Sequence, residues 1–226
     1  MIMNGQLNQR PDLVIFDMDG LILDSEQLFM EQERIVCLQY GYDMTPDNYI
    51  TTIGTAGETL RKILRDLYGE DYPMEKISRE SRERVNRIIE AQGPPVKPGI
   101  GELMETLYRN KIPFCICTST ETDTATHYME MAGFLPYLQF LKGGEQVTRS
   151  KPDPEIFLQA CEKAGVHPEG CLVLEDSPNG IRAALAAGMQ VIAIPDLVPV
   201  PEELKDRVTV EVVSAEEVPA LMGLNL

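Results

Sequence analysis

Short apolar runs recur along this chain, and stretches with helical spacing lie between them. The runs cover 13–16, 112–117, 171–174 and 190–194, with a weaker one at 137–141. In the intervening stretches, apolar residues recur at intervals of three and four, as expected of helices with one buried face. Buried strands that alternate with helices predict an α/β fold, a doubly wound parallel sheet covered on both faces.

The residues between the apolar runs include recognisable helix boundaries. Asp153 and Ser177 each stand directly before a proline, Pro154 and Pro178. An acidic or hydroxyl side chain followed by proline is typical of an N-cap and the first helical position. Gly165 lies where the helix that begins near Pro154 should end. Two helices are therefore predicted to start near residues 154 and 178.

One long segment contains no convincing buried strand. From 24 to 92 the apolar spacing is helical, in three stretches near 28–36, 60–68 and 77–89. The connector GPPVKPG follows, and its prolines and glycines are typical of a link between structural units. We expect a helical insert over 23–94, with the α/β core formed by 1–22 and 95–226, and hinges near 21–24 and 91–97.

Composition limits the classes of partner. The net charge is −16 and the isoelectric point is near 4.5, whereas nucleic acids and anionic membranes are bound through Lys and Arg patches. No apolar run approaches a membrane span of about 20 residues, and no secretion signal is recognisable at the N-terminus. The five cysteines lack CxxC spacing, which fits reduced thiols. We expect a cytoplasmic monomer that binds neither nucleic acid nor membrane.

Polar residues follow the predicted strands, or precede a predicted helix, where they could meet at one edge of the sheet. In an open parallel sheet, ligands bind at the carboxyl ends of the strands. The residues gathered there are carboxylates, hydroxyls and one ammonium: Asp17, Asp19, Thr118, Ser119, Lys151, Glu175 and Asp176.

These residue types together indicate phosphoryl chemistry. Several carboxylates around one point call for a hard divalent cation with oxygen ligands, and Mg²⁺ is the ion that we expect. Thr118, Ser119 and Lys151 can donate hydrogen bonds to the oxygens of a phosphate. One aspartate of the pair Asp17 and Asp19 can attack phosphorus, and the other can protonate the leaving oxygen and later activate water.

Four sequence motifs resemble those of one enzyme family. DMDGLILDSE, CTST, SKPDPEIF and LEDSPNGIRAALAAG, in this order, are similar to the four motifs of the haloacid dehalogenase-like (HAD) phosphatases, in the subgroup with a helical cap domain inserted after the first motif. The core is most similar to small-metabolite phosphatases such as the pseudouridine-5′-phosphatases. The resemblance implies a Mg²⁺-dependent hydrolase that acts on a small phosphate monoester, a sugar phosphate or a nucleotide, through an aspartyl-phosphate.

The resemblance also implies a role for each catalytic residue. Asp17 corresponds to the nucleophile and Asp19 to the general acid and base. Thr118 and Lys151 correspond to residues that bind the phosphoryl group, and the ammonium of Lys151 also moderates the charge on Asp17. The presence of Asp19 argues against the dehalogenases, which lack this second aspartate.

The metal ligands follow from the same motifs. The ion would be held by the Asp17 side chain, the backbone carbonyl of Asp19 and the Asp176 side chain. Glu175 belongs to the same motif, and whether it would bind the ion directly or through water is open.

Two alternative functions compete with a phosphatase. A β-phosphoglucomutase has a histidine and an arginine in its cap, and the matching positions here are Phe29 and Gly57, which count against a mutase. A receiver-like module also accepts a phosphoryl group on an aspartate at a strand end. The helical insert, Asp19 and the order of the motifs count against that second alternative.

Overall fold

The structure, a computed structural model, describes residues 2–3, 6–7, 9–53, 55 and 57–224. The chain divides into two compact units. One unit combines Met1–Leu23 with Val96–Leu226, and the other is Asp24–Pro95.

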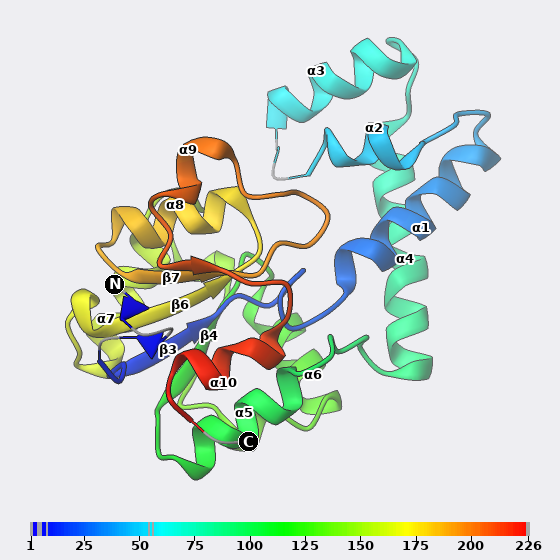
Figure 1. The fold of residues 1–226 in the computed structure, drawn as a ribbon. Coiled ribbons are helices and arrows are strands. Elements are labelled where there is room, and N and C mark those ends of the chain that lie inside the picture. Colours follow the sequence, from blue (N-terminus) through cyan, green and yellow to red (C-terminus); the bar gives the residue numbers. More distant parts are fainter. Residues whose placement is uncertain (1, 4–5, 8, 54, 56, 225–226) are drawn as a thin grey trace. The chain divides into compact units, whose positions relative to one another are not determined.

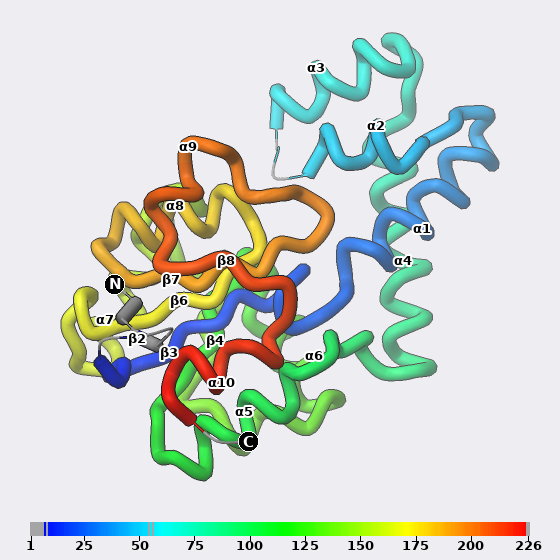
Figure 2. Tube along the Cα trace, viewed as in Figure 1, coloured from blue at the N-terminus to red at the C-terminus, as the bar shows by residue number. Residues whose placement is uncertain are grey.

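A six-stranded sheet forms the centre of the first unit (Figure 2). Every neighbouring pair of strands in it is parallel. The strands, in spatial order, are β5 (Leu141–Lys142), β4 (Phe114–Cys117), β3 (Leu13–Phe16), β6 (Cys171–Glu175), β7 (Gln190–Ala193) and β8 (Val210–Glu211). The doubly wound parallel sheet predicted from the sequence is confirmed.

Helices cover both faces of this sheet. Figure 1 shows α7 (Glu155–Ala164) and α8 (Pro178–Ala186) on one face, and α5 (Ile100–Arg109) and α10 (Val218–Leu221) on the other. The remaining elements are α6 (Thr122–Met131), α9 (Glu202–Lys205), four 3₁₀ turns (Leu135–Tyr137, Gly144–Gln146, Pro168–Gly170 and Ala215–Glu217) and a small antiparallel pair, β1 (Ile2–Met3) and β2 (Gln6–Leu7).

The central strands are continuous apolar runs because both of their faces are buried. Leu13 and Ile15 are fully buried in a cluster that includes Phe157 of α7. Phe16, the residue after Ile15, points to the opposite face of the sheet. Its ring centroid lies 5.6 Å from that of Phe114. The four strong runs lie in β3, β4, β6 and β7, which are the four interior strands of the sheet, as the sequence predicts.

The weaker run at 137–141 is only partly a strand. A 3₁₀ turn occupies Leu135–Tyr137, and β5 begins at Leu141. Because β5 lies at the edge of the sheet and pairs with one neighbour only, it can be short, and a long apolar run is not required to form it.

The two predicted helix starts differ in detail. Ser177 is the N-cap of α8, and its hydroxyl accepts a hydrogen bond from the Gly180 N–H at 3.1 Å. The helix α7 begins at Glu155 with Pro154 as N-cap, one residue later than predicted. The Asp153 carboxylate still accepts a hydrogen bond from the Glu155 N–H, at 3.1 Å, so it satisfies one of the free donors at this helix start.

In the described part of the second unit, the regular elements are all helices. They are α1 (Ser25–Gln39), α2 (Pro46–Ile50), α3 (Gly57–Tyr68) and α4 (Met74–Gln92). The three long helices correspond to the three predicted stretches. The short α2 was not predicted, although Thr45 caps it by accepting a hydrogen bond from the Asn48 N–H at 3.2 Å. The boundaries of the insert predicted from the sequence lie one residue before those of this unit.

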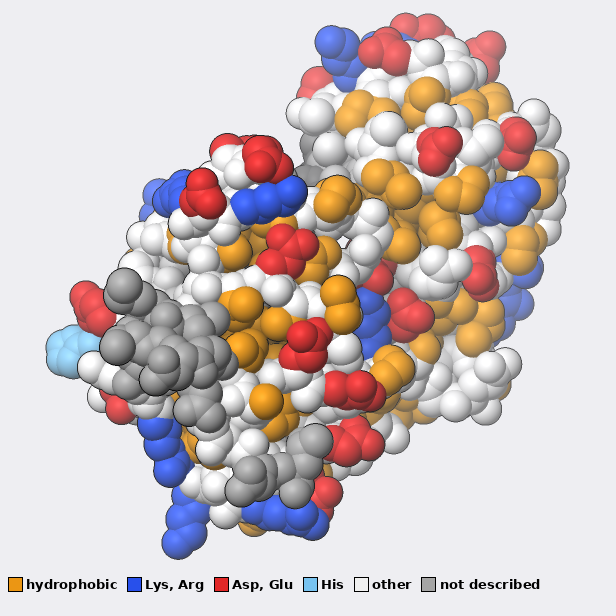
Figure 3. All heavy atoms as spheres, in the orientation of Figure 1, with side chains coloured by type: hydrophobic (Ala, Val, Ile, Leu, Met, Phe, Trp, Pro, Cys, Tyr) orange, Lys and Arg blue, Asp and Glu red, His pale blue; other side chains and the backbone are white. Residues whose placement is uncertain are grey.

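The surface carries mixed charge. On the face shown in Figure 3, Lys and Arg side chains lie in small separate groups among acidic and hydrophobic ones. In the part of the chain that the structure describes, no helix has both the length and the apolar character needed to cross a membrane.

Shortening a side chain in the centre of the sheet should destabilise the core unit. Ile15 is fully buried, so Ile15→Ala should lower the free energy of unfolding by about 2–5 kcal/mol. Val213 is 91% exposed, and Val213→Ala should change it by less than about 0.5 kcal/mol. Urea denaturation of both variants measures the free energies of unfolding. Equal losses of this free energy in the two variants would contradict the burial of Ile15 in the sheet.

Candidate active site

The register of the sheet brings the two acidic motifs to the same level. Phe16 of β3 pairs with Ile116 of β4 on one side and with Leu174 of β6 on the other. The Asp17 N–H continues this ladder with a 3.1 Å hydrogen bond to the Leu174 carbonyl. Asp17 and Glu175 therefore stand side by side at the carboxyl ends of neighbouring strands.

A tight turn follows Asp17. The N–H groups of Ile22 and Leu23 both donate to the Met18 carbonyl, at 2.9 and 3.0 Å. Gly20 in this turn has φ +81°, and a Cβ there would lie 2.3 Å from Asp176 Oδ2. Glycine is required at this position both for its positive φ and for the close approach of the Asp176 carboxylate.

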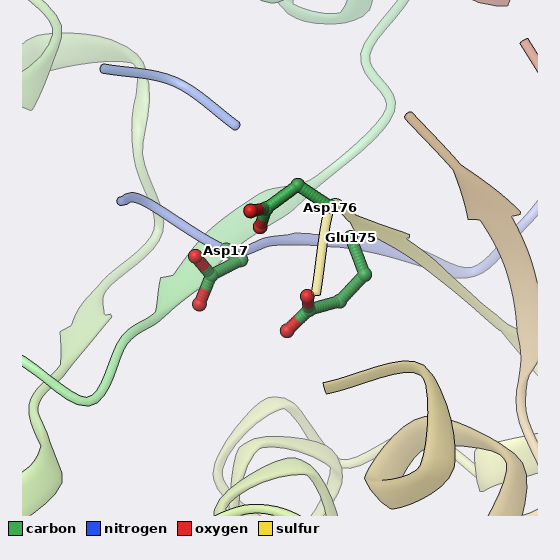
Figure 4. Close-up of side chains that lie close together, drawn as sticks. All are labelled: Asp17, Glu175 and Asp176. Carbon is green, nitrogen blue, oxygen red and sulfur yellow. The ribbon is translucent and has the colours of Figure 1, made fainter. Parts of the chain in front are cut away.

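Three carboxylates converge in this place (Figure 4). One oxygen from each of Asp17, Glu175 and Asp176 lies within 4.8 Å of the others. All three residues are buried, with exposed fractions of 6%, 0% and 8%. Among the described residues, Asp176 Oδ1 has no hydrogen-bond partner although it is buried. A buried carboxylate oxygen without a donor is costly unless a cation occupies the site.

Lys151 lies between two of these carboxylates. Its Nζ is 2.5 Å from Asp17 Oδ1, 2.6 Å from Glu175 Oε1 and 3.2 Å from the Cys117 carbonyl. The side chain is 7% exposed. An ammonium has three protons, so all of its hydrogen bonds are made inside the protein.

Burial and mutual repulsion change the acidity of the cluster. Burial raises the pKa of the Asp17 carboxyl from 3.8 to about 7; Lys151 opposes this shift and Glu175 adds to it. Burial, then the charges of Glu175 and Asp17, raise the pKa of Asp176 well above its ordinary value. Burial alone would lower the pKa of Lys151, but Asp17 and Glu175 outweigh it and raise that pKa. Lys151 is therefore a permanent cation in an acidic site.

The site fits a small divalent cation. Carboxylate oxygens are the ligands that Mg²⁺ prefers, and a cation would bind the unpartnered Asp176 Oδ1. It would also favour the ionised form of the two aspartates, against the burial and the repulsion that raise their pKa values. Glu175 is less suited to bind an ion directly, because Oε1 accepts from Lys151 and Oε2 accepts from the Ser177 N–H and hydroxyl at 3.1 and 3.0 Å.

The second aspartate of the first motif lies in a different environment. Asp19 Oδ2 accepts a hydrogen bond from the Thr120 hydroxyl at 2.6 Å and a longer one from the Thr118 hydroxyl at 3.3 Å. Thr118 is fully buried, whereas Ser119 is exposed. The Ser119 side chain makes no hydrogen bond to any described residue. Of the seven predicted residues, Lys151 thus binds Asp17 and Glu175, Asp176 has an oxygen within 4.8 Å of both, and Thr118 binds Asp19. Ser119 joins neither group.

Several residues of the site were not predicted. Thr120 and Ser177 bind the acidic side chains directly, although Ser177 was expected only as a helix cap. Gly180 leaves space for the Glu175 carboxylate, because a Cβ at this position would lie 1.7 Å from Glu175 Oε1. The Thr-Ser-Thr alternation after β4 was the one sequence signal for Thr120, since it puts two hydroxyls on the same side of the chain.

The sequence from 14 to 194 matches the family model of the haloacid dehalogenase-like hydrolases. That range holds all of the residues of the candidate site and more than half of the chain. This chain belongs to the haloacid dehalogenase-like hydrolase family.

Named relatives narrow the class of reaction. A probable pseudouridine-5′-phosphatase of Drosophila melanogaster is 35% identical over 189 residues, 80% of each chain. A phosphorylated carbohydrates phosphatase of Thermotoga maritima is 32% identical, over 80% of this chain and 83% of its own. The structure of a Thermotoga maritima protein provisionally named a β-phosphoglucomutase is similar, with a TM-score of 0.75, 29% identity, and 94% and 99% of the two chains covered. The curated relatives place the chain among the phosphatases of its family, as its motifs predict.

The contact between Gly180 and Glu175 can be tested with a matched pair of helical glycines. Gly180→Ala should displace the Glu175 carboxylate from Lys151 and lower phosphatase activity on the order of 100-fold, with a loss of about 1–3 kcal/mol in unfolding free energy. Gly101 of α5 has ordinary space around it, 3.9 Å to the nearest atom, so Gly101→Ala should keep activity and gain slightly in stability. Equal activity of the two variants would contradict the constraint on Glu175.

Proton competition should make metal binding depend on pH. A carboxyl whose pKa rises on folding binds more protons in the folded state, so without metal it lowers stability as pH rises from 3.8 to about 7. Mg²⁺ must displace these protons. The rise in melting temperature caused by Mg²⁺ should therefore be larger at pH 8 than at pH 5.5. Asp176→Asn should lose most of this rise, and a rise independent of pH would contradict a site built on Asp17 and Asp176.

Proposed function

We propose that this protein hydrolyses a small phosphate monoester in a Mg²⁺-dependent reaction that passes through an aspartyl-phosphate on Asp17. One observation carries the proposal: Asp17 is buried at a strand end, held by Lys151 at 2.5 Å, with Asp176 beside it and Asp19 two residues along the chain. This arrangement combines a nucleophile, a cation site and a proton donor, which are the parts that the reaction needs.

The cation would be held by Asp17 and Asp176, together with the backbone carbonyl of Asp19. When bound, Mg²⁺ would offset the negative charge of the carboxylates and of the phosphoryl group. Glu175 takes a supporting part in this proposal. It holds Lys151 through Oε1, and any interaction with the ion would pass through water.

The phosphoryl group would be bound by the groups that surround Asp17. Lys151 supplies a positive charge and Thr118 a hydroxyl. Ser119 is exposed at the start of the segment that leads into α6, where its hydroxyl and nearby backbone N–H groups can donate to phosphoryl oxygens.

The proposed reaction consists of two successive nucleophilic displacements at phosphorus. First, an Asp17 carboxylate oxygen attacks phosphorus, the bond from phosphorus to the leaving oxygen breaks, and Asp19 gives its proton to that oxygen, so that an alcohol departs. Second, Asp19 takes a proton from water, the resulting hydroxide attacks phosphorus, and orthophosphate leaves with restoration of the Asp17 carboxylate. The protons balance over the two steps.

The leaving group would be recognised by the helical unit Asp24–Pro95, which we propose to act as a cap that closes over the substrate. Relatives named for pseudouridine phosphate and for phosphorylated carbohydrates support a small phosphorylated metabolite as substrate. All five cysteines are free and buried, which supports a reducing compartment such as the cytoplasm. A monomeric state stays a prediction.

A mutase would need to retain a phosphorylated intermediate in the site while that intermediate reorients. Phe29 in α1 and Gly57 at the start of α3 offer no charged side chain for a second phosphate, and this favours hydrolysis. A receiver-like module would take up a phosphoryl group once, without repeated release of phosphate.

Phosphate release from a panel of monoesters tests the proposed function. The panel contains sugar phosphates, nucleoside 5′-phosphates with pseudouridine 5′-phosphate, glycerol phosphates and β-glucose 1-phosphate, each with Mg²⁺ and with EDTA. Catalytic release from one class is expected with Mg²⁺ only. Asp17→Asn should reduce kcat at least about 1,000-fold, since an amide cannot form the acyl phosphate.

The alternatives give different results in the same assay. Conversion of β-glucose 1-phosphate to the 6-phosphate without release of phosphate would identify a mutase. Release limited to one equivalent per protein would identify a phosphate-accepting module. Wild-type turnover by Asp17→Asn would exclude Asp17 as nucleophile.

A further inference from the structure

The carboxylate of Asp19 is held by two hydroxyls of unequal strength. Thr120 Oγ1 lies 2.6 Å from Asp19 Oδ2, and Thr118 Oγ1 lies 3.3 Å from the same oxygen. The first distance is that of a strong, charge-assisted hydrogen bond, and the second is beyond the usual range for two oxygens. Of these two hydroxyls, that of Thr120 therefore holds the Asp19 carboxylate more strongly.

The two threonines also differ in what else they must do. A hydroxyl has one proton, so Thr118 cannot donate to a phosphoryl oxygen and to Asp19 at the same time. The Thr118 oxygen in addition accepts a hydrogen bond from the Thr120 N–H at 3.0 Å, which fixes its position. The hydroxyl proton of Thr120, by contrast, goes to Asp19, 101 residues earlier in the chain.

From this difference we infer that Thr120 is the positioning residue for the general acid and base, and that it keeps Asp19 aligned when Thr118 turns to the phosphoryl group. The inference rests on the proposed function and adds a residue that acts through Asp19. Because Oδ2 accepts the Thr120 proton, the proton that Asp19 passes to the leaving oxygen, and later takes from water, is carried by Oδ1.

A leaving-group series separates this role from a structural one. The probes are p-nitrophenyl, phenyl and benzyl phosphate, which present the same ring but leaving oxygens of increasing basicity. A basic leaving oxygen needs a proton as its bond to phosphorus breaks, whereas p-nitrophenolate departs without one. The parameter kcat/KM reports the first chemical step, so it is sensitive to a misplaced Asp19 only where that proton is needed.

Thr120→Val keeps the shape of the side chain and removes the hydroxyl. For benzyl phosphate, kcat/KM should fall about 10- to 100-fold, because general acid catalysis by Asp19 is partly lost. For p-nitrophenyl phosphate, kcat/KM should fall less than about threefold. Thr120→Ser restores the hydroxyl and should recover benzyl phosphate hydrolysis to within about threefold of wild type. Thr120→Ala gives the same comparison if the valine variant does not fold.

A neighbouring threonine serves as the matched control. The Thr122 hydroxyl at the start of α6 donates to Glu145 and not to Asp19, so Thr122→Val should leave the ratio of the two kcat/KM values unchanged. Asp19→Asn combined with Thr120→Val should be no slower on benzyl phosphate than Asp19→Asn alone, since the two residues act as one unit.

The outcomes distinguish this inference from the proposed function. If wild type releases phosphate from all three esters but Thr120→Val lowers kcat/KM for all of them equally, or for none, Thr120 does not position the acid. An additive loss in the double variant would lead to the same conclusion. If wild type hydrolyses none of the esters or the metabolites of the panel, the phosphatase function itself is wrong and the role of Thr120 falls with it.

Discussion

The buried ion pairs of Lys151 are the interaction on which the rest of this site depends. Three carboxylates at neighbouring strand ends would repel one another and resist burial. The ammonium lies within 2.6 Å of two of them, Asp17 and Glu175, so their charge is partly offset without access to water. Ser177 and Gly180 serve the same arrangement, because one binds Glu175 and the other leaves it the space to reach Lys151.

Asp17 and Asp19 lie two residues apart in the chain but have different surroundings. Asp17 is buried among charged groups, and its pKa rises to about 7 chiefly because of burial. Asp19 is only partly buried and is held by the hydroxyls of Thr118 and Thr120. A carboxylate fixed beside an ammonium and a cation site suits attack on phosphorus, whereas one held by neutral hydroxyls can exchange a proton. Paired acids with different surroundings commonly divide the work of a reaction in this way.

The sequence was sufficient to predict the fold and most of the residues that the structure brings together in the candidate site. The central strands were recognisable because burial on both faces demands a continuous apolar run, and the acidic residues because ligands gather at strand ends. The edge strand β5 and the short helix α2 were not recognisable from the sequence, since neither has to bury a long apolar face. Thr120 could not be told apart from Thr118 or Ser119 by composition, because its role depends on a contact across 101 residues of chain. The space that Gly180 leaves for Glu175 depends equally on the folded backbone.

A count of charges supports the cation proposed for this site. The protein carries a net charge of −16, so no general field attracts an anionic ester. When all three carboxylates of the cluster are ionised, they and the one ammonium sum to −2, and Lys151 already directs two of its protons to carboxylates. Its third proton goes to the neutral Cys117 carbonyl at 3.2 Å, and this is the weakest of the three bonds and the one that a phosphoryl oxygen can replace. One such hydrogen bond cannot offset the repulsion between a phosphate dianion and the cluster, whereas the proposed divalent ion on Asp17 and Asp176 would cancel the −2.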